Sequence, residues 1–233
     1  MKLAIMQPYI FPYIGYFQLM SSVDKFVVYD DIEFTKRGWI RRNRYLLNGK
    51  DVLFSLPLEK DSDYLDIVER KLTEDYQEEV KKILRRLDAA YNKAPYFEKV
   101  YSLLEECFLY EDRNLFRFIH FSLEKTKSYL NIQTPLLISS ELGIKERLKG
   151  EERVLSICKH LGAEHYINAI GGQELYKKEK FLDEGIKLSF IKSGDIFYTQ
   201  FNEPFVPSLS IIDVMMFNSP DEINKMLNNY KLI

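Results

Sequence analysis

Residues 2–31 read KLAIMQPYIFPYIGYFQLMSSVDKFVVYDD, and this stretch decides the fold class. Its two short apolar runs, Lys2–Met6 and Lys25–Tyr29, are typical of buried strands. Between them, Tyr13–Ser22 carries apolar residues at helical spacing. A strand, a helix and a second strand in succession predict a crossover connection and two parallel strands in one sheet. The chain therefore begins with a β–loop–α–β unit like those that bind nucleotides.

The last hundred residues alternate in the same way. Their pattern predicts strands over Leu136–Ile138, His165–Asn168 and Lys187–Ile191, and helices over Gly150–Leu161 and Leu175–Glu184. In the first of these helices we place Arg153 and Lys159 on the polar side. We therefore predict an α/β protein whose mainly parallel sheet is built from residues 1–58 and 134–233.

The middle of the chain has a different pattern. Asn48-Gly49 lies between two apolar runs in Arg44–Leu58, which predicts a hairpin because Asn-Gly accepts the positive φ angles of a type I′ turn. From about residue 75 to 130, apolar residues recur every three or four positions, which predicts three helices. We interpret residues 1–233 as a single α/β domain with a helical insertion at about 75–130.

Composition limits the classes of function. The chain is 46% hydrophobic and 29% charged, so it can bury a core. Its net charge of −2 excludes a polycation that binds nucleic acid with its whole surface. Two cysteines are too few for a disulfide framework and suit a reducing compartment. We find no signal-peptide pattern and no apolar run long enough to span a membrane, so we expect a cytoplasmic location.

The connection after the first strand is rich in aromatic residues. Residues 7–16, QPYIFPYIGY, contain two prolines, one glycine and four aromatic side chains, and no charge. Gln7 should point into the crevice where α/β folds bind ligands, and Gly15 allows a ligand to approach the backbone closely. Tyr9 and Tyr13 are further candidates for ligand contact. The alternative is a tight, aromatic-packed connection without a ligand.

An acidic pair, Asp30-Asp31, ends the second strand. Either carboxylate could take a proton from a substrate, hold Mg²⁺, or bind a ribose hydroxyl or an amine, so Gln7, Asp30 and Asp31 are our catalytic candidates. The pair could also simply begin a turn. The sequence has no dedicated metal motif, so we expect Mg²⁺ only together with a nucleotide.

A cationic loop follows. Residues 35–44, TKRGWIRRNR, place five cations around the only tryptophan of the chain. Arginine forks match phosphate oxygens, and an exposed indole can stack on a base. The candidate binding residues are Lys36, Arg37, Trp39, Arg41 and Asn43. The alternative is a solvated charged face. Arginine and tryptophan side chains together could also bind nucleic acid. A single short cationic segment on a slightly acidic protein favours a small ligand instead.

Five later residues complete the set: Asn168, Gly171, Gly172, Ser210 and Asp213. Gly171-Gly172 follows a predicted strand that ends at Asn168, and could cradle a phosphate or form a plain turn. Ser210 and Asp213 lie in an apolar segment, where a buried aspartate needs a partner and Ser210 could instead cap a helix. We expect the main candidates to converge on one cleft at the carboxyl ends of the first two strands: Gln7, Tyr13, Gly15, Asp30, Lys36 and Arg41.

Several long motifs resemble the WbqC-like family. They are MQPYIFPYIGYFQLM from residue 6, VYDDIEFTKRGWIRRNR from residue 28, NKAPYF from residue 92, KGEERVLSICKHLGA from residue 149, YINAIGGQELY from residue 166 and LSIIDVMMFNS from residue 209. Members are typically encoded among genes for bacterial O-antigen and other surface polysaccharides. The opening is also loosely similar to nucleotidylyl transferases and pantothenate synthetases, with Tyr13 and Tyr16 in place of their histidines.

Two classes of function follow from the residues and the resemblance. The first is an enzyme of surface polysaccharide biosynthesis that acts on a nucleotide-linked amino sugar, by acyl or aminoacyl transfer that forms an amide. Asp30 or Asp31 would then accept the proton of the amine, and Lys36, Arg37 and Arg41 would hold the diphosphate. The second is a non-catalytic protein that binds a nucleotide-sugar or nucleic acid. The sequence sets no oligomeric state.

Overall fold

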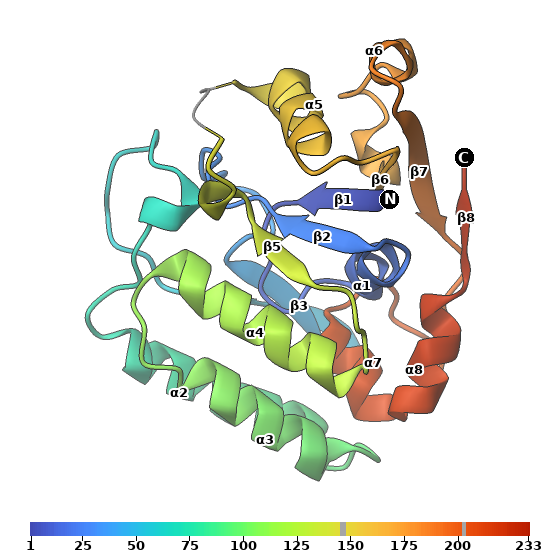
Figure 1. Ribbon diagram of the computed structural model, residues 1–233. Helices are drawn as coiled ribbons and strands as arrows, with labels where there is room; N and C mark the ends of the chain where they lie inside the picture. The colour runs from blue at the N-terminus through green and yellow to red at the C-terminus, as the bar shows by residue number, and fades with distance from the viewer. Residues whose placement is uncertain (145–147, 202–203) are drawn as a thin grey trace.

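The computed structural model describes residues 1–144, 148–201 and 204–233 (Figure 1). Its strands are β1 (Lys2–Met6), β2 (Lys25–Val28), β3 (Arg42–Leu47), β4 (Lys50–Ser55), β5 (Leu136–Ile138), β6 (His165–Ala169), β7 (Lys187–Ser193) and β8 (Tyr230–Leu232). Its α-helices are α1 (Ile14–Ser21), α2 (Tyr76–Tyr91), α3 (Phe97–Phe108), α4 (Leu115–Tyr129), α5 (Gly150–His160), α6 (Lys178–Asp183), α7 (Ile211–Phe217) and α8 (Pro220–Leu227).

The main sheet has the strand order β5-β2-β1-β6-β7-β8. All neighbouring strands are parallel except β8, which is antiparallel to β7. Counted along the chain, the five parallel strands therefore follow the order 3-2-1-4-5, which doubly wound α/β folds share. The prediction of a mainly parallel sheet is confirmed, and β1 lies inside it. The chain adds strands first on one side of β1 and then on the other, so the order reverses between β1 and β6.

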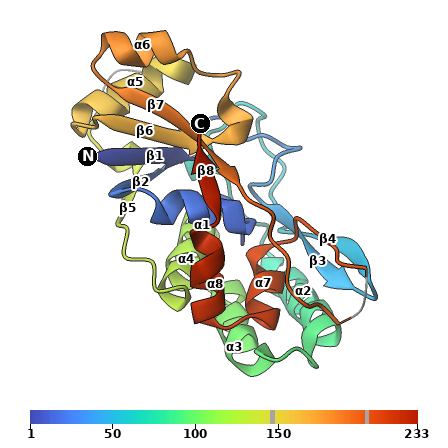
Figure 2. The same ribbon diagram turned by 90° about the vertical axis from the view of Figure 1, so that its right-hand side faces the viewer.

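Helices cover both faces of this sheet (Figures 1 and 2). On β2, Phe26 and Val28 belong to the larger core, which they share with residues of α1 and α4. Val27 and Tyr29 belong to the smaller core, which they share with residues of α5 and α6. This alternation follows from the two-residue period of a strand. It also determines the directions in which the next residues, Asp30 and Asp31, point.

The predicted hairpin is confirmed, although it lies outside the main sheet. β3 and β4 pair only with each other, and Asn48 and Gly49 connect them with φ angles of 51° and 74°. These positive angles are those of a type I′ turn, which suits the twist of the two strands. Our expectation that residues 1–58 contribute entirely to one sheet is wrong for this hairpin. Its inner residues Tyr45 and Phe54 pack instead in the larger core.

Helices α2, α3 and α4 occupy the stretch in which we predicted three helices. In Figure 1, α4 lies below β5 and β2, with α2 and α3 on its far side. The apolar stripe of α2 is buried, with Val80, Leu84 and Leu87 in the larger core. The block therefore forms a further layer on the α1 side of the sheet.

Two other elements differ from the prediction. The helix expected over Leu175–Glu184 is shorter, because α6 begins only at Lys178 and Leu175 is exposed in the turn before it. β8 was not predicted, since three residues at the edge of a sheet leave little pattern. In the described ranges, no helix is long and apolar enough to cross a membrane.

Candidate functional site

A cavity of about 380 Å³ lies at the carboxyl ends of β1, β6 and β7. Met6 lines it at the end of β1, Ala169 and Ile170 at the end of β6, and Ile191 and Ser193 on β7. This is the point at which the strand order reverses, and open α/β sheets bind ligands at such a point. We call it the switch-point cavity.

Aromatic side chains form much of its wall. Tyr9, Tyr13, Tyr16 and Trp39 all line the cavity, and the Tyr9 and Tyr16 ring centroids are 5.8 Å apart. Burial raises the pKa of each of these three tyrosines, so their phenols stay protonated near neutral pH and can donate hydrogen bonds. Trp39 is 42% exposed, so part of its indole surface is free for contact.

Asn43 holds the aromatic connection in place. Its side-chain amide donates to the carbonyl oxygens of Ile10 and Phe11, at 3.2 and 2.7 Å. Phe11 has a φ of 41°, a strained angle for a residue with a side chain, and these bonds help to fix it. Asn43 also lines the switch-point cavity.

Two candidates of the first connection, Gly15 and Gln7, already have close contacts within the protein. A Cβ on Gly15 would lie 3.1 Å from Ser193 Oγ and 3.3 Å from the Tyr13 ring, so Gly15 allows α1 to approach β7 closely. The backbone carbonyl of Gln7 accepts a hydrogen bond from the Tyr16 hydroxyl at 3.1 Å. The side-chain oxygen of Gln7 accepts a longer one from Tyr9, at 3.4 Å.

Arg44 is the one charged residue among the described residues that line the switch-point cavity. Its guanidinium donates to Asp51 at 3.0 Å and to the Ser208 carbonyl at 3.2 Å, and lies 5.4 Å from the centroid of the Trp39 ring. Its Nε is buried and has no hydrogen-bond partner among the described residues. The guanidinium of Arg44 suits an anionic ligand, because its fork of N–H donors matches phosphate oxygens.

The other cations of the loop lie elsewhere. Lys36 forms an exposed ion pair with Asp63 at 2.5 Å. Arg41 donates to Ser55 Oγ at 2.6 Å and to the Leu56 carbonyl at 2.7 Å, and burial, with neighbouring arginines, lowers its pKa. The carbonyl oxygen of Arg37 accepts a hydrogen bond from Arg42. None of Lys36, Arg37 and Arg41 lines the switch-point cavity.

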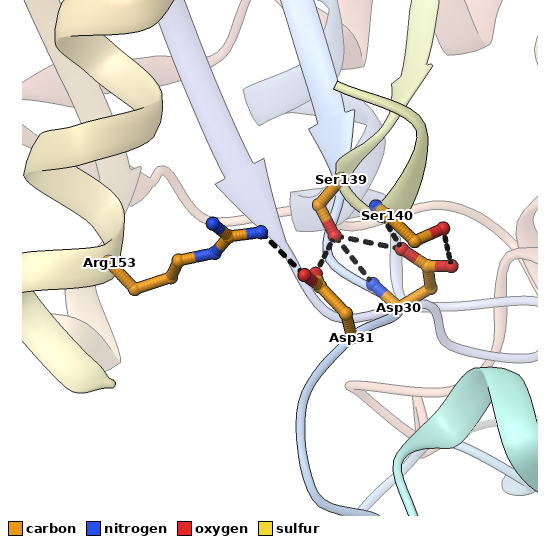
Figure 3. Close-up of polar contacts among 5 residues, drawn as sticks. All are labelled: Asp30, Asp31, Ser139, Ser140 and Arg153. Atoms are coloured by element: carbon orange, nitrogen blue, oxygen red, sulfur yellow. Dashed lines mark hydrogen bonds and ion pairs between the residues drawn. The ribbon is translucent and has the colours of Figure 1, made fainter. Parts of the chain in front are cut away.

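The acidic pair forms a polar cluster where β2 and β5 end (Figure 3). Asp30 is fully buried, and its carboxylate accepts hydrogen bonds from Ser139 Oγ at 2.8 Å, from Ser140 N at 3.0 Å and from Ser140 Oγ at 2.7 Å. The Ser139 hydroxyl also contacts a carboxylate oxygen of Asp31. The cluster therefore connects the ends of β2 and β5.

Asp31 points to the opposite face of the sheet. Its second oxygen forms an ion pair with Arg153 Nη2 at 2.5 Å. Arg153 is buried on α5, so our placement of Arg153 on the polar side of that helix is wrong. Burial is the main cause, and the negative charge of Asp31 the second, that raise the pKa of the adjacent Tyr29 to about 12. Arg153 lies four residues before the buried Ile157 and so on the same helix face, and this spacing was the sequence signal that Arg153 is buried.

The residues that we expected in a single cleft do not lie together in the structure. Tyr13 and Gly15 line the switch-point cavity, whereas Asp30 lines a second cavity beside α4. Lys36 and Arg41 line neither. The reason is topological: β2 and β5 lie on one side of β1, and β6 and β7 lie on the other. In the part of the chain that the structure describes, no group of three or more His, Cys, Asp or Glu side chains could hold a metal ion.

Asn168, Gly171 and Gly172 form the turn that follows β6. The side-chain oxygen of Asn168 accepts from the Ala169 N–H at 2.7 Å, and Gly171 and Gly172 belong to the short 3-10 turn Ile170–Gly172. A Cβ on Gly172 would lie 2.8 Å from Asn168 Nδ2, whereas one on Gly171 would meet no atom within 4 Å.

This contrast gives a matched pair of variants. Gly172→Ala should lower the free energy of unfolding by about 2 kcal/mol, because Asn168 must move and release the Ala169 N–H. Gly171→Ala should change it by less than about 0.5 kcal/mol. Urea denaturation of both variants measures the difference. Equal effects would show that the turn tolerates a side chain at either glycine.

Ser210 and Asp213 are both buried around the start of α7. Ser210 caps the helix by accepting from the Ile212 N–H at 3.2 Å, and it donates to the Phe11 carbonyl at 2.7 Å. Asp213 accepts hydrogen bonds from Tyr91, Tyr198 and Gln200. Neither residue lines the switch-point cavity. Their contacts position the neighbouring segment that carries Ser208, which does line it.

Comparison with known proteins gives one family. A model of the WbqC-like protein family matches residues 7–225. An uncharacterized protein of Mycobacterium tuberculosis (strain ATCC 25618 / H37Rv), Rv1507c, is 30% identical over 220 residues, which is 93% of each chain. No solved structure matches. The family match covers almost all of the chain, including the aromatic connection, the acidic pair and the cationic loop, and the chain belongs to the WbqC-like protein family.

Proposed function

We propose that this protein binds a nucleotide or a nucleotide-linked sugar in the switch-point cavity and acts on it in bacterial surface polysaccharide biosynthesis. One observation carries the proposal. A cavity walled by four aromatic side chains, with Arg44 as its charged residue, lies where the strand order reverses. Rings and a phosphate-binding group together suit a ligand that has both a base and a phosphate.

Size and the start of α1 support this ligand class. A volume of about 380 Å³ lies within the range of small-molecule sites. The first turn of α1 contains no acidic residue, and Gly15 in that turn lines the cavity. The free N–H groups at a helix start attract anions. The phosphates would therefore lie between α1 and Arg44, and the rings against Tyr9, Tyr13 and Trp39.

For the reaction, we propose transfer of an acyl or aminoacyl group from an activated acyl donor to the amine of an amino sugar. The amide C–N bond forms, and the bond between the acyl carbon and its leaving group breaks. A base must accept the proton of the amine. Asp30 and Asp31 are the candidates from the sequence, and neither lines the switch-point cavity. The resemblance to a family encoded among polysaccharide genes supports the amino-sugar substrate. Mg²⁺ would be held mainly by the phosphates of the ligand, since the described side chains provide no metal cluster of their own.

A non-catalytic role in binding a nucleotide-sugar or nucleic acid is the second candidate. One observation favours it: the carboxylates of Asp30 and Asp31 already accept hydrogen bonds from Ser139, Ser140 and Arg153. Asp30 also lines the second cavity rather than the first. A carboxylate held in this way can serve as a structural connection instead of a base.

Calorimetry with UDP and UDP-N-acetylglucosamine, with and without Mg²⁺, tests the proposed ligand. Arg44→Ala should weaken binding about 10- to 100-fold, because a charge-assisted hydrogen bond to phosphate contributes about 1.5–3 kcal/mol. Trp39→Ala should weaken it by a comparable factor if the indole stacks on the base. Lys36→Ala is the matched control, since it removes an exposed cation of the same loop away from the cavity.

Two results would contradict the proposal. Either an unchanged affinity in Arg44→Ala and Trp39→Ala, or an equal loss in Lys36→Ala, would place the ligand outside the switch-point cavity. Mass spectrometry with amino-sugar nucleotides and acyl donors then separates the two functions. Asp30→Asn or Asp31→Asn should abolish product without loss of binding if one of them is the base. Binding without any product from the wild type would favour the non-catalytic role.

A further inference from the structure

The second cavity has a volume of about 400 Å³ and lies between the ends of β2 and β5 and one side of α4. Asp30, Ile138 and Ser140 line it at and just beyond the ends of β2 and β5, and Phe116, His120 and Glu124 line it from α4. It is separate from the switch-point cavity, because no described residue lines both. We call it the acidic cavity.

The charge of its lining is negative. Asp30, Glu124 and Glu141 contribute three carboxylates, and Arg117 is the single cation among the described lining residues. Arg117 is mostly exposed and lies 3.5 Å from Asp112 outside the cavity. Lys127 pairs with Glu124, also at 3.5 Å, and offsets part of that carboxylate's charge, which leaves three carboxylates against two cations. A cation entering the cavity would therefore meet an excess of negative charge.

The remaining wall is aromatic and apolar. Tyr110 and Phe121 stack with their ring centroids 4.2 Å apart, and Phe116 lies 5.5 Å from the His120 ring. Val68 and Ile138 complete this side. Phe121 already has the Lys125 ammonium 5.2 Å from its ring centroid, so a cation beside an aromatic face is present at this end of the molecule.

His120 adds an unsatisfied polar atom. Its Nε2 is buried and has no hydrogen-bond partner among the described residues. Burial lowers the pKa of His120, although the carboxylates of Glu124, Glu141 and Asp30 oppose this, so the imidazole is neutral at neutral pH. A neutral imidazole has one nitrogen that can accept a hydrogen bond, and a ligand N–H is a suitable donor.

We propose that the acidic cavity binds a small molecule that carries a primary ammonium group on an apolar or aromatic frame. The ammonium would lie beside the Glu124 and Glu141 carboxylates, since the Asp30 carboxylate is fully buried and already bound by Ser139 and Ser140, and the frame would lie against Phe116 and Tyr110. A metal ion fits less well, because no described group of three or more metal-ligating side chains converges here. An anionic ligand would be repelled. This site is independent of the nucleotide proposed for the switch-point cavity.

Three matched probes test the proposal with the full chain: phenethylamine, its neutral analogue 2-phenylethanol, and the anion phenylacetate. Ligand-observed NMR titration should show saturable binding of phenethylamine, with at least about tenfold weaker binding of the alcohol and none of the acid. Binding of phenethylamine should also weaken as salt is raised.

Variants locate the site. Glu124→Gln combined with Glu141→Gln should weaken phenethylamine binding about tenfold, and both positions are exposed enough for the variant to fold. Glu152→Gln on α5 is the control, because it removes a carboxylate from the other face of the sheet. UDP affinity should be unchanged in both the double variant and the Glu152→Gln control, so a failure here is distinct from a failure of the nucleotide proposal. Equal binding of amine and alcohol, no saturable amine binding, or an unchanged affinity in the double variant would overturn the proposal.

Discussion

Asp213→Ala should lower the free energy of unfolding by about 4 kcal/mol. The Asp213 carboxylate is fully buried and accepts from Tyr91 Oη at 2.8 Å, Tyr198 Oη at 2.7 Å and Gln200 Nε2 at 2.8 Å. Alanine leaves three donors without this acceptor, and each unpaired buried donor costs about 1–3 kcal/mol. Urea denaturation followed by circular dichroism measures the change.

Two controls separate the carboxylate from the space that it fills. Asp213→Asn keeps one acceptor oxygen and should cost clearly less than alanine. Tyr91→Phe should cost about 1–2 kcal/mol, because the Leu46 N–H also donates to this hydroxyl at 2.8 Å. If Asp213→Ala were as stable as the wild type, the network would contribute nothing to the fold.

Asp213 should also make the free energy of unfolding depend on pH. Burial is the main cause that raises the pKa of Asp213 above its ordinary value. A raised pKa in the folded state gives stability that is present below the unfolded pKa, near pH 4, and is lost as pH rises through the folded pKa. The stability of the wild type relative to Asp213→Asn should therefore fall from about pH 4 upward. A difference that grows with pH would contradict this assignment.

Arg153→Ala should be the second most damaging change, at about 3 kcal/mol. Removing one partner of a buried ion pair leaves the other charge uncompensated, which typically costs 3–5 kcal/mol. We take the lower end because the Asp31 side chain is 25% exposed and keeps some contact with water. The free energy of unfolding from urea titration is again the measurement.

The control for Arg153 lies on the same helix. Lys159 pairs with Glu184 at 2.7 Å, but both side chains are largely exposed, so Lys159→Ala should cost less than about 0.5 kcal/mol. Removing both members of the buried pair, as Asp31→Leu with Arg153→Met, should restore part of the stability lost in Arg153→Ala. Equal losses in Lys159→Ala and Arg153→Ala would mean that burial of the pair has no energetic consequence.

The fold could be predicted from the sequence where the local pattern was strong. β1 and the hairpin turn at Asn48-Gly49 were predicted because apolar runs and positive-φ residues act over a few neighbours. β8 was missed because its three residues owe their structure to the edge of β7. The hairpin was assigned to the main sheet because pairing between distant strands leaves no local signal.

The site was harder to predict for the same reason. The sequence drew attention to Trp39 and Asn43, which do line the switch-point cavity, because their motif is chemically unusual. It could not show that Arg44, rather than Lys36 or Arg41, reaches that cavity. Which cation of a loop faces inward depends on tertiary contacts such as those of Arg41 with Ser55 and Leu56. Ser139, which binds both aspartates, was missed because it is more than a hundred residues from them in sequence.

The position of Ser139 has a consequence for the hydrogen bonds of the two aspartates on the two faces of the sheet. Its hydroxyl carries one proton, yet its oxygen lies within hydrogen-bond distance of Asp30 on one face and Asp31 on the other. Only one of the two carboxylates can receive that proton at a time. Rotation of the hydroxyl hydrogen about the Cβ–Oγ bond is therefore enough to change which aspartate receives the hydrogen bond, with almost no movement of heavy atoms.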